Sequence, residues 1–334
     1  MKVQLIREFG TPDVFEAADI DTPSPGAGQV LVRQIASSVN PVDTKLRAAG
    51  PPIAPELPGV LGCDVAGVVE AVGEGVTRLK KGDAVYGCAG GLRGRGGAYG
   101  EYIVVDAAFM AFKPEALDWR ETAALPLVTI TAWEAMVDRT RVMPGDHVLI
   151  HGGAGGVGHI AIQLAKAFDL KVITTAGSEE KCKAAKDLGA DLAINYKTED
   201  FVEKVNDFTA GKGADVILDM VSGDYVQRNL DCLAIDGRHV TIAALGGAKA
   251  EINMAKLMSK RQTMTGSTLR PRSDEFKALL GDEIRTHAWP LFEDRTVAPV
   301  MDETFDLTDV AAAHARMEEG DHIGKIVLRV RDID

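Results

Sequence analysis

Three glycines near the middle of the chain have a spacing that can hold a phosphate group. Gly153, Gly155 and Gly158 follow an apolar run at residues 147–151 and precede a helix-like segment at residues 159–168. The G-x-G-x-x-G spacing between a strand and a helix lets the backbone approach the pyrophosphate of a dinucleotide. The first N–H groups of the helix and its positive dipole end would then face the anion. We therefore expect cofactor contacts from Gly153, Gly155, Gly156, Val157 and Gly158.

The end of the next expected strand bears on which dinucleotide is bound. An NAD-type site usually has Asp or Glu about 20 residues beyond the glycines, where it binds the ribose 2′-OH. The strand at residues 171–176 ends instead in Gly177 and Ser178, and Lys181 adds positive charge one turn later. Gly177 leaves room for a phosphate and Ser178 can donate a hydrogen bond, so this end favours NADPH. Glu179-Glu180 oppose that interpretation, although acids at a helix start can point outward and favour its dipole.

A few polar residues are candidates for the reacting centre. Asn40 could contact a substrate oxygen or the nicotinamide, or it could only cap a turn. Thr131 could hold the cofactor carboxamide, or it could be a hydroxyl at the start of a helix. Tyr99 could donate to a carbonyl, but a packing or surface role is the simpler interpretation. Arg93 and Arg95 could guide an anionic group, or they could be two solvated loop arginines.

Composition and charge limit the classes of partner. The 334 residues include 37 Lys and Arg against 49 Asp and Glu, so the formal net charge is −12. Binding to nucleic acid or to an anionic membrane depends on neutralising phosphate, which this balance opposes. The sequence also has no signal-peptide pattern and no apolar run of about 18 residues. We expect a cytoplasmic protein without a nucleic-acid or membrane partner.

Cysteine and histidine spacing gives no metal-binding pattern. None of the four cysteines belongs to a C-x-x-C pair, which predicts separate thiols in or near the core. His147 and His151 would lie at opposite ends of one strand, too far apart to share a metal. The absence of a G-x-S-x-G elbow also argues against a serine hydrolase. The cysteines are Cys63, Cys88, Cys182 and Cys232.

Two parts of the chain differ in their secondary-structure rhythm. Up to residue 126, short β-rich runs between Gly and Pro clusters predict an antiparallel barrel-like or sandwich domain. From residue 127, strands and helices alternate, which predicts a doubly wound parallel sheet. A helix at 274–292, a helix at 308–319 and a strand at 325–330 then break the alternation, so we expect this tail to return to the first domain. The strands expected in the second part are 147–151, 171–175, 192–195, 216–220, 239–243 and 264–269.

These motifs together resemble the medium-chain dehydrogenase/reductase superfamily, most closely its zinc-independent quinone oxidoreductase branch of zeta-crystallin-like enzymes. The resemblance implies an α/β fold with a GroES-like catalytic domain formed by residues 1–126 and 271–334. It implies a Rossmann NADPH-binding domain at residues 127–270, with NADPH in the cleft between the domains. Besides the glycines, the matching segments are Asn40-Pro41-Val42-Asp43, Leu61–Val69, Val72–Val76, Gly82–Tyr86, Thr131-Ala132-Trp133, Ile194-Asn195-Tyr196 and Gly324–Leu328.

The resemblance also implies which residues contact the cofactor. Asn40 and Asp43 match a segment at the nicotinamide and the substrate, and Thr131 matches a residue near the nicotinamide. The positions around the adenosine 2′-phosphate are Gly177, Ser178, Lys181 and Tyr196. Strand ends that line the cofactor are matched by Ala243–Leu245 and Ser267–Leu269, and Lys325 belongs to the same cofactor-binding set.

Departures from the zinc-dependent branch bear on the chemistry. That branch has a catalytic cysteine at the position of Asn40 and a Gly-His-Glu sequence at the position of Gly62-Cys63-Asp64. Its four-cysteine lobe has no counterpart, because the corresponding region is the glycine-rich Gly87–Gly100. A catalytic zinc needs three protein ligands and an open position. Cys63 and Asp64 remain as candidate ligands without a convincing third, so we expect no metal.

The sequence therefore predicts NADPH-dependent reduction of a quinone or of an α,β-unsaturated carbonyl, an enone or alkenal. Hydride would add at a position conjugated to oxygen, so hydrogen-bond donors and a late proton from water can suffice. One alternative is a non-catalytic NADPH-binding protein that senses redox state or binds a partner, and another is a zinc-type alcohol dehydrogenase. We also expect a homodimer or homotetramer, in which an edge strand at residues 264–269 could pair.

Overall fold

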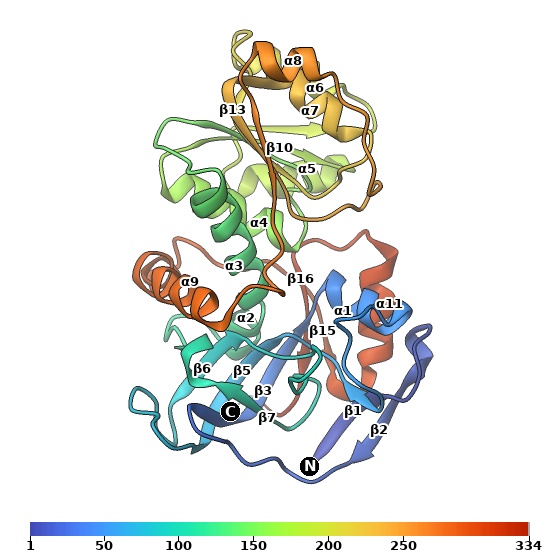
Figure 1. Cartoon of the computed structure of the whole chain (residues 1–334), viewed down its shortest axis with the longest axis vertical. Coiled ribbons are helices and arrows are strands. Elements are labelled where there is room, and N and C mark those ends of the chain that lie inside the picture. The colour runs from blue at the N-terminus through green and yellow to red at the C-terminus, as the bar shows by residue number, and fades with distance from the viewer. Residues whose placement is uncertain (333–334) are drawn as a thin grey trace. The chain divides into compact units, whose positions relative to one another are not determined.

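The computed structural model describes residues 1–332, and the chain divides into two compact units. Unit 1 combines residues 1–128 with the chain from Asp274 onward, and unit 2 is Thr129–Ser273. Unit 1 is rich in antiparallel strands, whereas unit 2 contains a parallel sheet with intervening helices (Figure 1). The predicted fold class, α/β with a β-rich part and a doubly wound part, is confirmed.

Unit 2 is organised by a six-stranded parallel sheet in the order β11-β10-β9-β12-β13-β14. Its central strands are apolar and buried on both faces, as expected where helices cover a parallel sheet. Leu149, Ile173, Ile194 and Ile217 from four of the strands form one cluster with side chains of the neighbouring helices. The strands are β9 (His147–Ile150), β10 (Lys171–Ala176), β11 (Leu192–Asn195), β12 (Ala214–Asp219), β13 (Leu233–Thr241) and β14 (Thr263–Gly266).

The helices of unit 2 follow the strands, so each strand ends in a turn that leads into a helix or a loop. Three of these helices begin at a side-chain cap, on Ser178, Asp200 or Asn253. The helices are α4 (Gly156–Ala167), α5 (Glu179–Asp187), α6 (Phe201–Phe208), α7 (Tyr225–Cys232) and α8 (Met254–Ser259). Before them, α3 (Pro126–Trp133) continues into a π-helical turn at Glu134–Arg139.

Unit 1 contains two β-sheets. A small antiparallel sheet has the order β2-β1-β4, and a seven-stranded sheet has the order β15-β16-β3-β5-β6-β8, with β7 also paired to β3. The C-terminal strand β16 pairs antiparallel with β3, so both sequence segments of unit 1 contribute to this sheet. The strands are β1 (Lys2–Ile6), β2 (Phe15–Asp19), β3 (Gln29–Val39), β4 (Gly59–Val60), β5 (Asp64–Val72), β6 (Ala84–Cys88), β7 (Tyr102–Asp106), β8 (Met110–Phe112), β15 (Met301–Asp306) and β16 (Lys325–Arg329).

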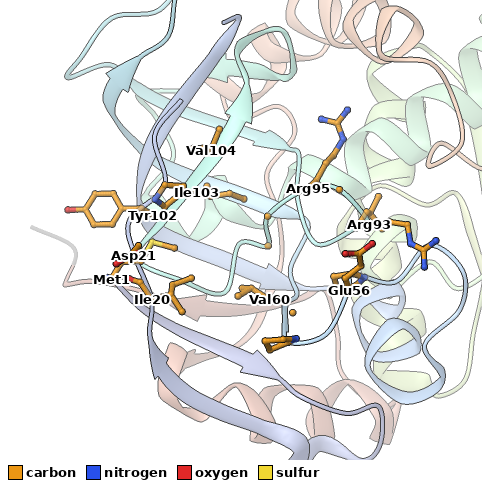
Figure 2. A pocket seen from close by; sticks show the side chains of 18 residues that line it. Met1, Ile20, Asp21, Glu56, Val60, Arg93, Arg95, Tyr102, Ile103 and Val104 are labelled. Carbon is orange, nitrogen blue, oxygen red and sulfur yellow. Dashed lines mark hydrogen bonds between the residues drawn. The ribbon is translucent and has the colours of Figure 1, made fainter. Parts of the chain in front are cut away.

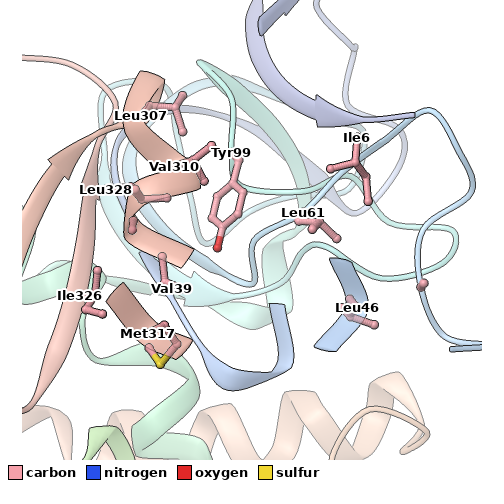
Figure 3. Close-up of a cluster of buried hydrophobic side chains, with 12 residues drawn as sticks. Ile6, Val39, Leu46, Leu61, Tyr99, Leu307, Val310, Met317, Ile326 and Leu328 are labelled. Carbon is pink, nitrogen blue, oxygen red and sulfur yellow. The ribbon is translucent and has the colours of Figure 1, made fainter. Parts of the chain in front are cut away.

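The core of unit 1 brings distant segments together. α11 lies beside α1, and Leu46, Tyr99, Val310 and Ile326 belong to one buried cluster (Figures 1 and 3). The hydroxyl of Tyr99 lies within this otherwise apolar cluster (Figure 3). The helices of unit 1 are α1 (Pro41–Ala49), α2 (Trp119–Ala123), α9 (Asp274–His287), α10 (Trp289–Glu293) and α11 (Val310–Glu319).

The bounds expected for three elements were wrong. The helix expected at 274–292 is two helices, α9 and α10, because Pro290 lacks the N–H that a continuous helix would use. The strand expected at 264–269 ends at Gly266, and the one expected at 239–243 ends at Thr241. The residues beyond these two strand ends therefore belong to loops at the carboxyl edge of the sheet.

The cysteines do not form disulfide bonds in the described structure. All four cysteines are free thiols, three of them buried and Cys88 partly buried, which confirms the expectation of separate thiols in or near the core. Across residues 1–332, the structure contains no helix that combines the length and the apolar character needed to cross a bilayer.

Candidate functional site

The glycine loop, residues 152–158, links β9 to α4 in unit 2. Gly155 caps α4, whose first residues are Gly156, Val157 and Gly158, so their N–H groups project from the helix N-terminus. The loop is tied to the neighbouring strand, because the Gly153 N–H donates to the Thr175 carbonyl at 3.0 Å. This strand–loop–helix arrangement is the context that the glycine spacing required for anion binding.

Two of the loop positions have no room for a side chain. A Cβ on Gly153 would lie 2.1 Å from Thr174 Oγ1, and a Cβ on Gly158 would lie 2.2 Å from the Gly152 carbonyl oxygen. The second contact is with the backbone, which cannot turn away as a flexible side chain can. Glycine is therefore required here for close packing of the loop against the strand and the helix.

The end of β10 brings four predicted residues together. Ser178 caps α5 by accepting a hydrogen bond from the Lys181 N–H at 3.2 Å. A Cβ on Gly177 would lie 2.8 Å from the Tyr196 hydroxyl, so this partly exposed tyrosine lies against the glycine. The Tyr196 N–H donates to the carbonyl of Ala176, which fixes the ends of β10 and β11 side by side.

The two glutamates that opposed NADPH binding lie at the start of α5. Glu179 accepts a hydrogen bond from Asn195 Nδ2 at 2.8 Å, and Asn195 is only 6% exposed. The Glu179 carboxylate is thus held at the end of β11 by this bond, although Glu179 and Glu180 are both exposed. Both acids also lie in the first turn of a helix, where the dipole favours negative charge.

The remaining predicted residues of unit 2 lie in loops or in α3. Ala243 and Leu245 follow β13, and Ser267 and Leu269 follow β14, so all four lie beyond the carboxyl ends of strands. The Ser267 N–H donates to the Thr241 carbonyl at 2.9 Å, which joins the two strand ends. Thr131 lies in the last turn of α3, so its interpretation as a helix-start hydroxyl was wrong.

A chain of buried polar side chains adjoins the glycine loop, and the sequence analysis missed it. His151 lies 3.0 Å from Thr175 Oγ1 and 2.8 Å from Asn229 Oδ1. Asn229 in turn lies 3.3 Å from His239, whose Nε2 is 3.1 Å from Asp219. Burial lowers the pKa of His151, so the imidazole stays neutral and acts as a linker. This chain of hydrogen bonds connects the ends of β9, β10, β12 and β13. The sequence could have indicated it, because its members are polar residues within or next to apolar strands.

Unit 1 contains a second buried polar group, centred on Asn40. Its Oδ1 accepts from Lys325 Nζ at 2.5 Å, and its Nδ2 donates to Asp64 Oδ2 at 2.7 Å. Lys325 also lies 3.5 Å from Asp64 Oδ2 and 3.3 Å from the Val39 carbonyl oxygen. An ammonium can only donate and a carboxylate can only accept, so the orientation of the Asn40 amide is fixed. Asn40 precedes α1 at the capping position, but its side chain is directed to these two ions.

Asp64 has further donors that the sequence analysis missed. Its carboxylate accepts from the Ser38 hydroxyl at 2.5 Å and from the Leu127 N–H at 2.8 Å. Lys325 is therefore a partner of Asn40 and Asp64 within unit 1, because its ammonium donates to Asn40 and to the Val39 carbonyl and lies 3.5 Å from Asp64. Its predicted role as a cofactor contact remains a prediction.

Asp43 is fully buried beneath Asn40. Its carboxylate accepts from the Asn40 N–H at 2.9 Å and from the Cys63 thiol at 3.2 Å. Burial raises the pKa of Asp43 to about 6, and the nearby charge of Asp64 acts in the same direction, while the two hydrogen bonds act against it. Asp43 thus fixes the backbone that carries Asn40, and its contact with the cofactor remains a prediction.

A hydrogen-bonded chain connects the buried Tyr99 to Glu318, an exposed residue. Arg47 pairs with Glu318 at 2.5 Å and lies 3.5 Å from His314 Nδ1, and His314 Nε2 lies 3.1 Å from the Tyr99 hydroxyl. Because Arg47 can only donate, His314 carries its hydrogen on Nε2 and donates to Tyr99. Burial, with the Arg47 charge, lowers the pKa of His314 to about 3, so it is neutral. The packing interpretation of Tyr99 is confirmed.

The loop arginines line a hollow in unit 1. This hollow has a volume of about 490 Å³, with Arg93, Arg95 and Glu56 toward one end and Ile20 and Tyr102 toward the other (Figure 2). Arg95 is half-buried and pairs with Asp106 at 2.5 Å and Asp274 at 2.8 Å, so its interpretation as a solvated arginine was wrong. Apart from Arg93 and Arg95, none of the candidate site residues lines this hollow.

The structure offers no ligand set for a metal ion among its described residues. Within residues 1–332, no three His, Cys, Asp or Glu side chains are grouped so as to hold a metal ion. His147 begins β9 and His151 follows its end, as the sequence predicted.

Comparison with known proteins places this geometry in a family. A model of the alcohol dehydrogenase GroES-like domain matches residues 26–115, and a model of zinc-binding dehydrogenases matches residues 156–283. The quinone oxidoreductase of Homo sapiens is 33% identical over 98% of this chain and 97% of its own. A 2-haloacrylate reductase of Burkholderia sp is 35% identical over 97% of both chains. The crystal structure of Escherichia coli quinone oxidoreductase complexed with NADPH has a TM-score of 0.88 and 30% identity, over 99% of this chain and 100% of that one.

The fold, the glycine loop and these similarities define the class: the chain belongs to the medium-chain dehydrogenase/reductase superfamily. Within it, the chain is a member of the zeta-crystallin-like quinone oxidoreductase branch and an oxidoreductase of that type. The resemblance inferred from the motifs is confirmed.

Proposed function

We propose that this protein reduces a quinone or an α,β-unsaturated carbonyl with NADPH. Its membership in the quinone oxidoreductase branch supports the reaction class. The names of two relatives, a quinone oxidoreductase and a 2-haloacrylate reductase, support the two acceptor classes. Both acceptors carry a carbon–carbon double bond conjugated to a carbonyl or carboxyl group, which is the feature that accepts hydride.

The residues of unit 2 fit a dinucleotide phosphate. The glycine loop would hold the pyrophosphate at the N-terminus of α4, and Gly153 and Gly158 let the loop pack closely in that position. Gly177, Ser178, Lys181 and Tyr196 would surround the 2′-phosphate. When bound, NADPH supplies the hydride, and the protein supplies position and electric field. The NADPH complex of the Escherichia coli relative supports this cofactor.

One observation supports the proposal that the protein reduces a conjugated acceptor: the ammonium of Lys325 donates a hydrogen bond to the amide oxygen of Asn40. The Asn40 amide nitrogen has two hydrogens, and Asp64 accepts one of them. The second can donate to the oxygen on which negative charge develops in an enolate or a quinol. Because Lys325 and Asp64 fix the amide before the reaction, little reorganisation is required of it.

The same residues do not fit a catalytic zinc ion. Zinc prefers nitrogen and sulfur ligands, and a catalytic site needs three from the protein. At this position Asn40 replaces the cysteine of the zinc-dependent branch, and Asp64 already accepts from Ser38, Asn40 and Leu127. The Lys325 ammonium, 3.5 Å from Asp64, would also repel a dication.

Turnover with a panel of acceptors tests the proposal. The purified protein is mixed with NADPH and with small quinones, enones and alkenals, while the loss of reduced-cofactor absorbance is followed. We expect turnover with at least one conjugated acceptor and none with a saturated ketone of the same size. Tight NADPH binding without turnover of any acceptor would overturn the proposal in favour of a non-catalytic binding protein.

The Asn40→Leu variant tests the role of the amide. Leucine has a similar size but no donor, so we expect kcat to fall by about 100-fold, the typical effect of removing one oxyanion donor. The dissociation constant for NADPH should change far less, and this difference separates a role at the acceptor from a loss of the folded state. An unchanged kcat would contradict the role of Asn40.

We also propose a homodimer or homotetramer that pairs along β14. This strand is at the edge of the six-stranded sheet, and its four residues are exposed or partly exposed. An open edge offers unpaired N–H and C=O groups to another strand. Sedimentation equilibrium should show a dimer or a tetramer, and a monomer at micromolar concentration would contradict this assembly.

A further inference from the structure

The contact between α5 and β11 bears on cofactor choice. Ser178 and Glu179 are the capping and first residues of α5, and Asn195 is the last residue of β11. Asn195 Nδ2 donates to Glu179 Oε1 at 2.8 Å. The next residue along, Tyr196, lies against Gly177, so the amide–carboxylate bond adjoins the proposed 2′-phosphate site.

The orientation of the Asn195 amide is determined by its second partner. Its Oδ1 accepts from the Lys197 N–H at 3.2 Å, so the nitrogen must face Glu179. The Asn195 N–H also donates to Glu199 at 3.1 Å, which holds the backbone in place. With 6% exposure, Asn195 is a fixed donor, and the carboxylate of Glu179 is the flexible partner that it restrains.

An unrestrained carboxylate at this position would favour NADH for two reasons. It could accept a hydrogen bond from the ribose 2′-OH, as the acid of an NAD-type site does. It would also repel a 2′-phosphate, which carries no hydrogen for it to accept at neutral pH. Restraint of Glu179 therefore removes both effects without removing the residue.

We propose that Asn195 determines cofactor specificity by holding Glu179 away from the 2′ position of the adenosine ribose. This inference rests on the proposed function, because it presumes that a 2′-phosphate binds beside Gly177, Ser178 and Lys181. Asn195 acts through Glu179, so it is a positioning residue. It explains how a chain with two acids directly after Ser178 can accept NADPH.

The Asn195→Asp variant removes the restraint at almost constant size. The new carboxylate can still accept from the Lys197 N–H, but its other oxygen faces Glu179 at hydrogen-bonding distance, so the two carboxylates repel each other. We expect the ratio of NADH to NADPH dissociation constants, measured by equilibrium fluorescence titration, to fall by about tenfold. The matched control is Asn253→Asp, which makes the same charge change at the cap of α8 in unit 2 and should leave the ratio unchanged.

A swapped pair separates the hydrogen bond from the added charge. In Asn195→Asp combined with Glu179→Gln, the amide and the carboxylate exchange places, so the bond and the net charge are both retained. We expect this double variant to recover the wild-type ratio to within about threefold, while Glu179→Gln alone keeps or raises the preference for NADPH. Recovery would also show that Asn195→Asp acts through Glu179 and not through misfolding.

The outcomes distinguish this inference from the proposed function. A wild-type protein that binds NADH in preference to NADPH would overturn the proposed cofactor. A wild-type preference for NADPH that is unchanged in Asn195→Asp would overturn only the role of Asn195. The role of Asn195 in specificity would also be overturned if Asn195→Asp weakened the binding of both cofactors equally. The same holds if the swapped pair did not recover the wild-type ratio of dissociation constants.

Discussion

The ammonium of Lys325 lies 2.5 Å from the amide oxygen of Asn40, although 285 positions separate the two residues. The same ammonium lies 3.5 Å from Asp64, and both side chains of this ion pair are almost completely buried. Desolvation of two charges is costly, so the pair is stable only because each ion has further hydrogen-bond partners. The group therefore joins the C-terminal strand β16 to α1 and β5 through electrostatics as well as through packing.

Replacement of Lys325 should destabilise unit 1 strongly. In Lys325→Met, Asp64 keeps its charge in a buried position without a cation, so we expect a loss of about 3–5 kcal/mol in urea unfolding. The control is Lys81→Met, which removes an exposed partner of Glu70 and should cost about 0–1 kcal/mol. Adding Asp64→Asn to Lys325→Met should reduce the loss, since the uncompensated charge is then absent. Similar losses for the two single variants would contradict the buried pair.

The Tyr99 hydroxyl should contribute to stability through its hydrogen bond with His314. Tyr99→Phe keeps the ring in the core but leaves the buried His314 Nε2–H without a partner. We expect a loss of about 1–3 kcal/mol in the free energy of unfolding, typical of unsatisfied buried groups. Tyr102→Phe, at a half-buried tyrosine whose ring faces Arg331, should stay within about 0.5 kcal/mol. A Tyr99→Phe variant as stable as the wild type would show that the Tyr99–His314 hydrogen bond contributes nothing to the free energy of unfolding.

The features that could be predicted from the sequence are those that depend on residues close together along the chain. The glycine loop, the missing acid after β10 and the alternation of strands and helices are local patterns, so the sequence predicted the fold class and the dinucleotide loop. The Tyr99–His314 contact joins residues 215 positions apart, and no local pattern connects them. Lys325 was included because of a motif, but its contacts with Asn40 and Asp64 depend on how β16 pairs with β3.

Some features were visible in the sequence but were given the wrong weight. Pro290 is a strong helix breaker, yet one continuous helix was expected at residues 274–292. Arg95 was treated as a loop residue because its partner Asp274 lies 179 positions away. Glu179 and Asn195 were both noted, one as an acid beside the phosphate and one within a motif. Their hydrogen bond follows from the pairing of β10 with β11, which periodicity alone does not specify.

His314 should make stability fall as the pH decreases. Its folded pKa is about 3 and its unfolded value is about 6.5, so between these values the unfolded state binds the extra proton. Stability present above pH 6.5 is therefore lost toward pH 3, at up to about 1.4 kcal/mol per pH unit. His314→Gln should flatten the dependence of the unfolding free energy on pH between 6.5 and 4. An unchanged slope would contradict a buried neutral imidazole.

Asp43 should make stability rise as the pH decreases, opposite to the effect of His314, over an overlapping pH range. Its folded pKa of about 6 exceeds the reference value of 3.8, so here the folded state binds the extra proton between pH 6 and 3.8. Stability from this group therefore rises as the pH falls through 6, and Asp43→Asn removes that gain. We expect this variant to lose stability more steeply than the wild type between pH 6 and 4. Urea unfolding at three pH values checks the sign, and a shallower slope would refute the raised pKa.

The glycine loop should tolerate substitution unequally. A Cβ at position 158 would lie 2.2 Å from the Gly152 carbonyl oxygen, so Gly158→Ala must displace backbone and should cost about 1–3 kcal/mol in stability. Gly155 has a φ of −82°, and its nearest neighbour is 3.3 Å from a Cβ, so Gly155→Ala should fold with a smaller loss. Both variants should weaken NADPH in fluorescence titration. The methyl group of Gly155→Ala would obstruct the approach of the pyrophosphate, and Gly158→Ala would displace the loop that is proposed to hold it. Equal stability of the two would contradict the close packing at position 158.

Lys181 should distinguish the two cofactors if it faces the 2′-phosphate. A hydrogen bond to a charged group contributes about 1.5–3 kcal/mol, so Lys181→Ala should weaken NADPH by roughly 10- to 100-fold and NADH much less. Lys183→Ala is the matched control, because Lys183 is an exposed lysine of the same helix that pairs with Asp187. Calorimetric titration of each variant with both cofactors gives the comparison. If Lys181→Ala weakened the two cofactors equally, its charge would act on the dinucleotide as a whole, and the position of the 2′-phosphate beside Ser178 would have to be abandoned.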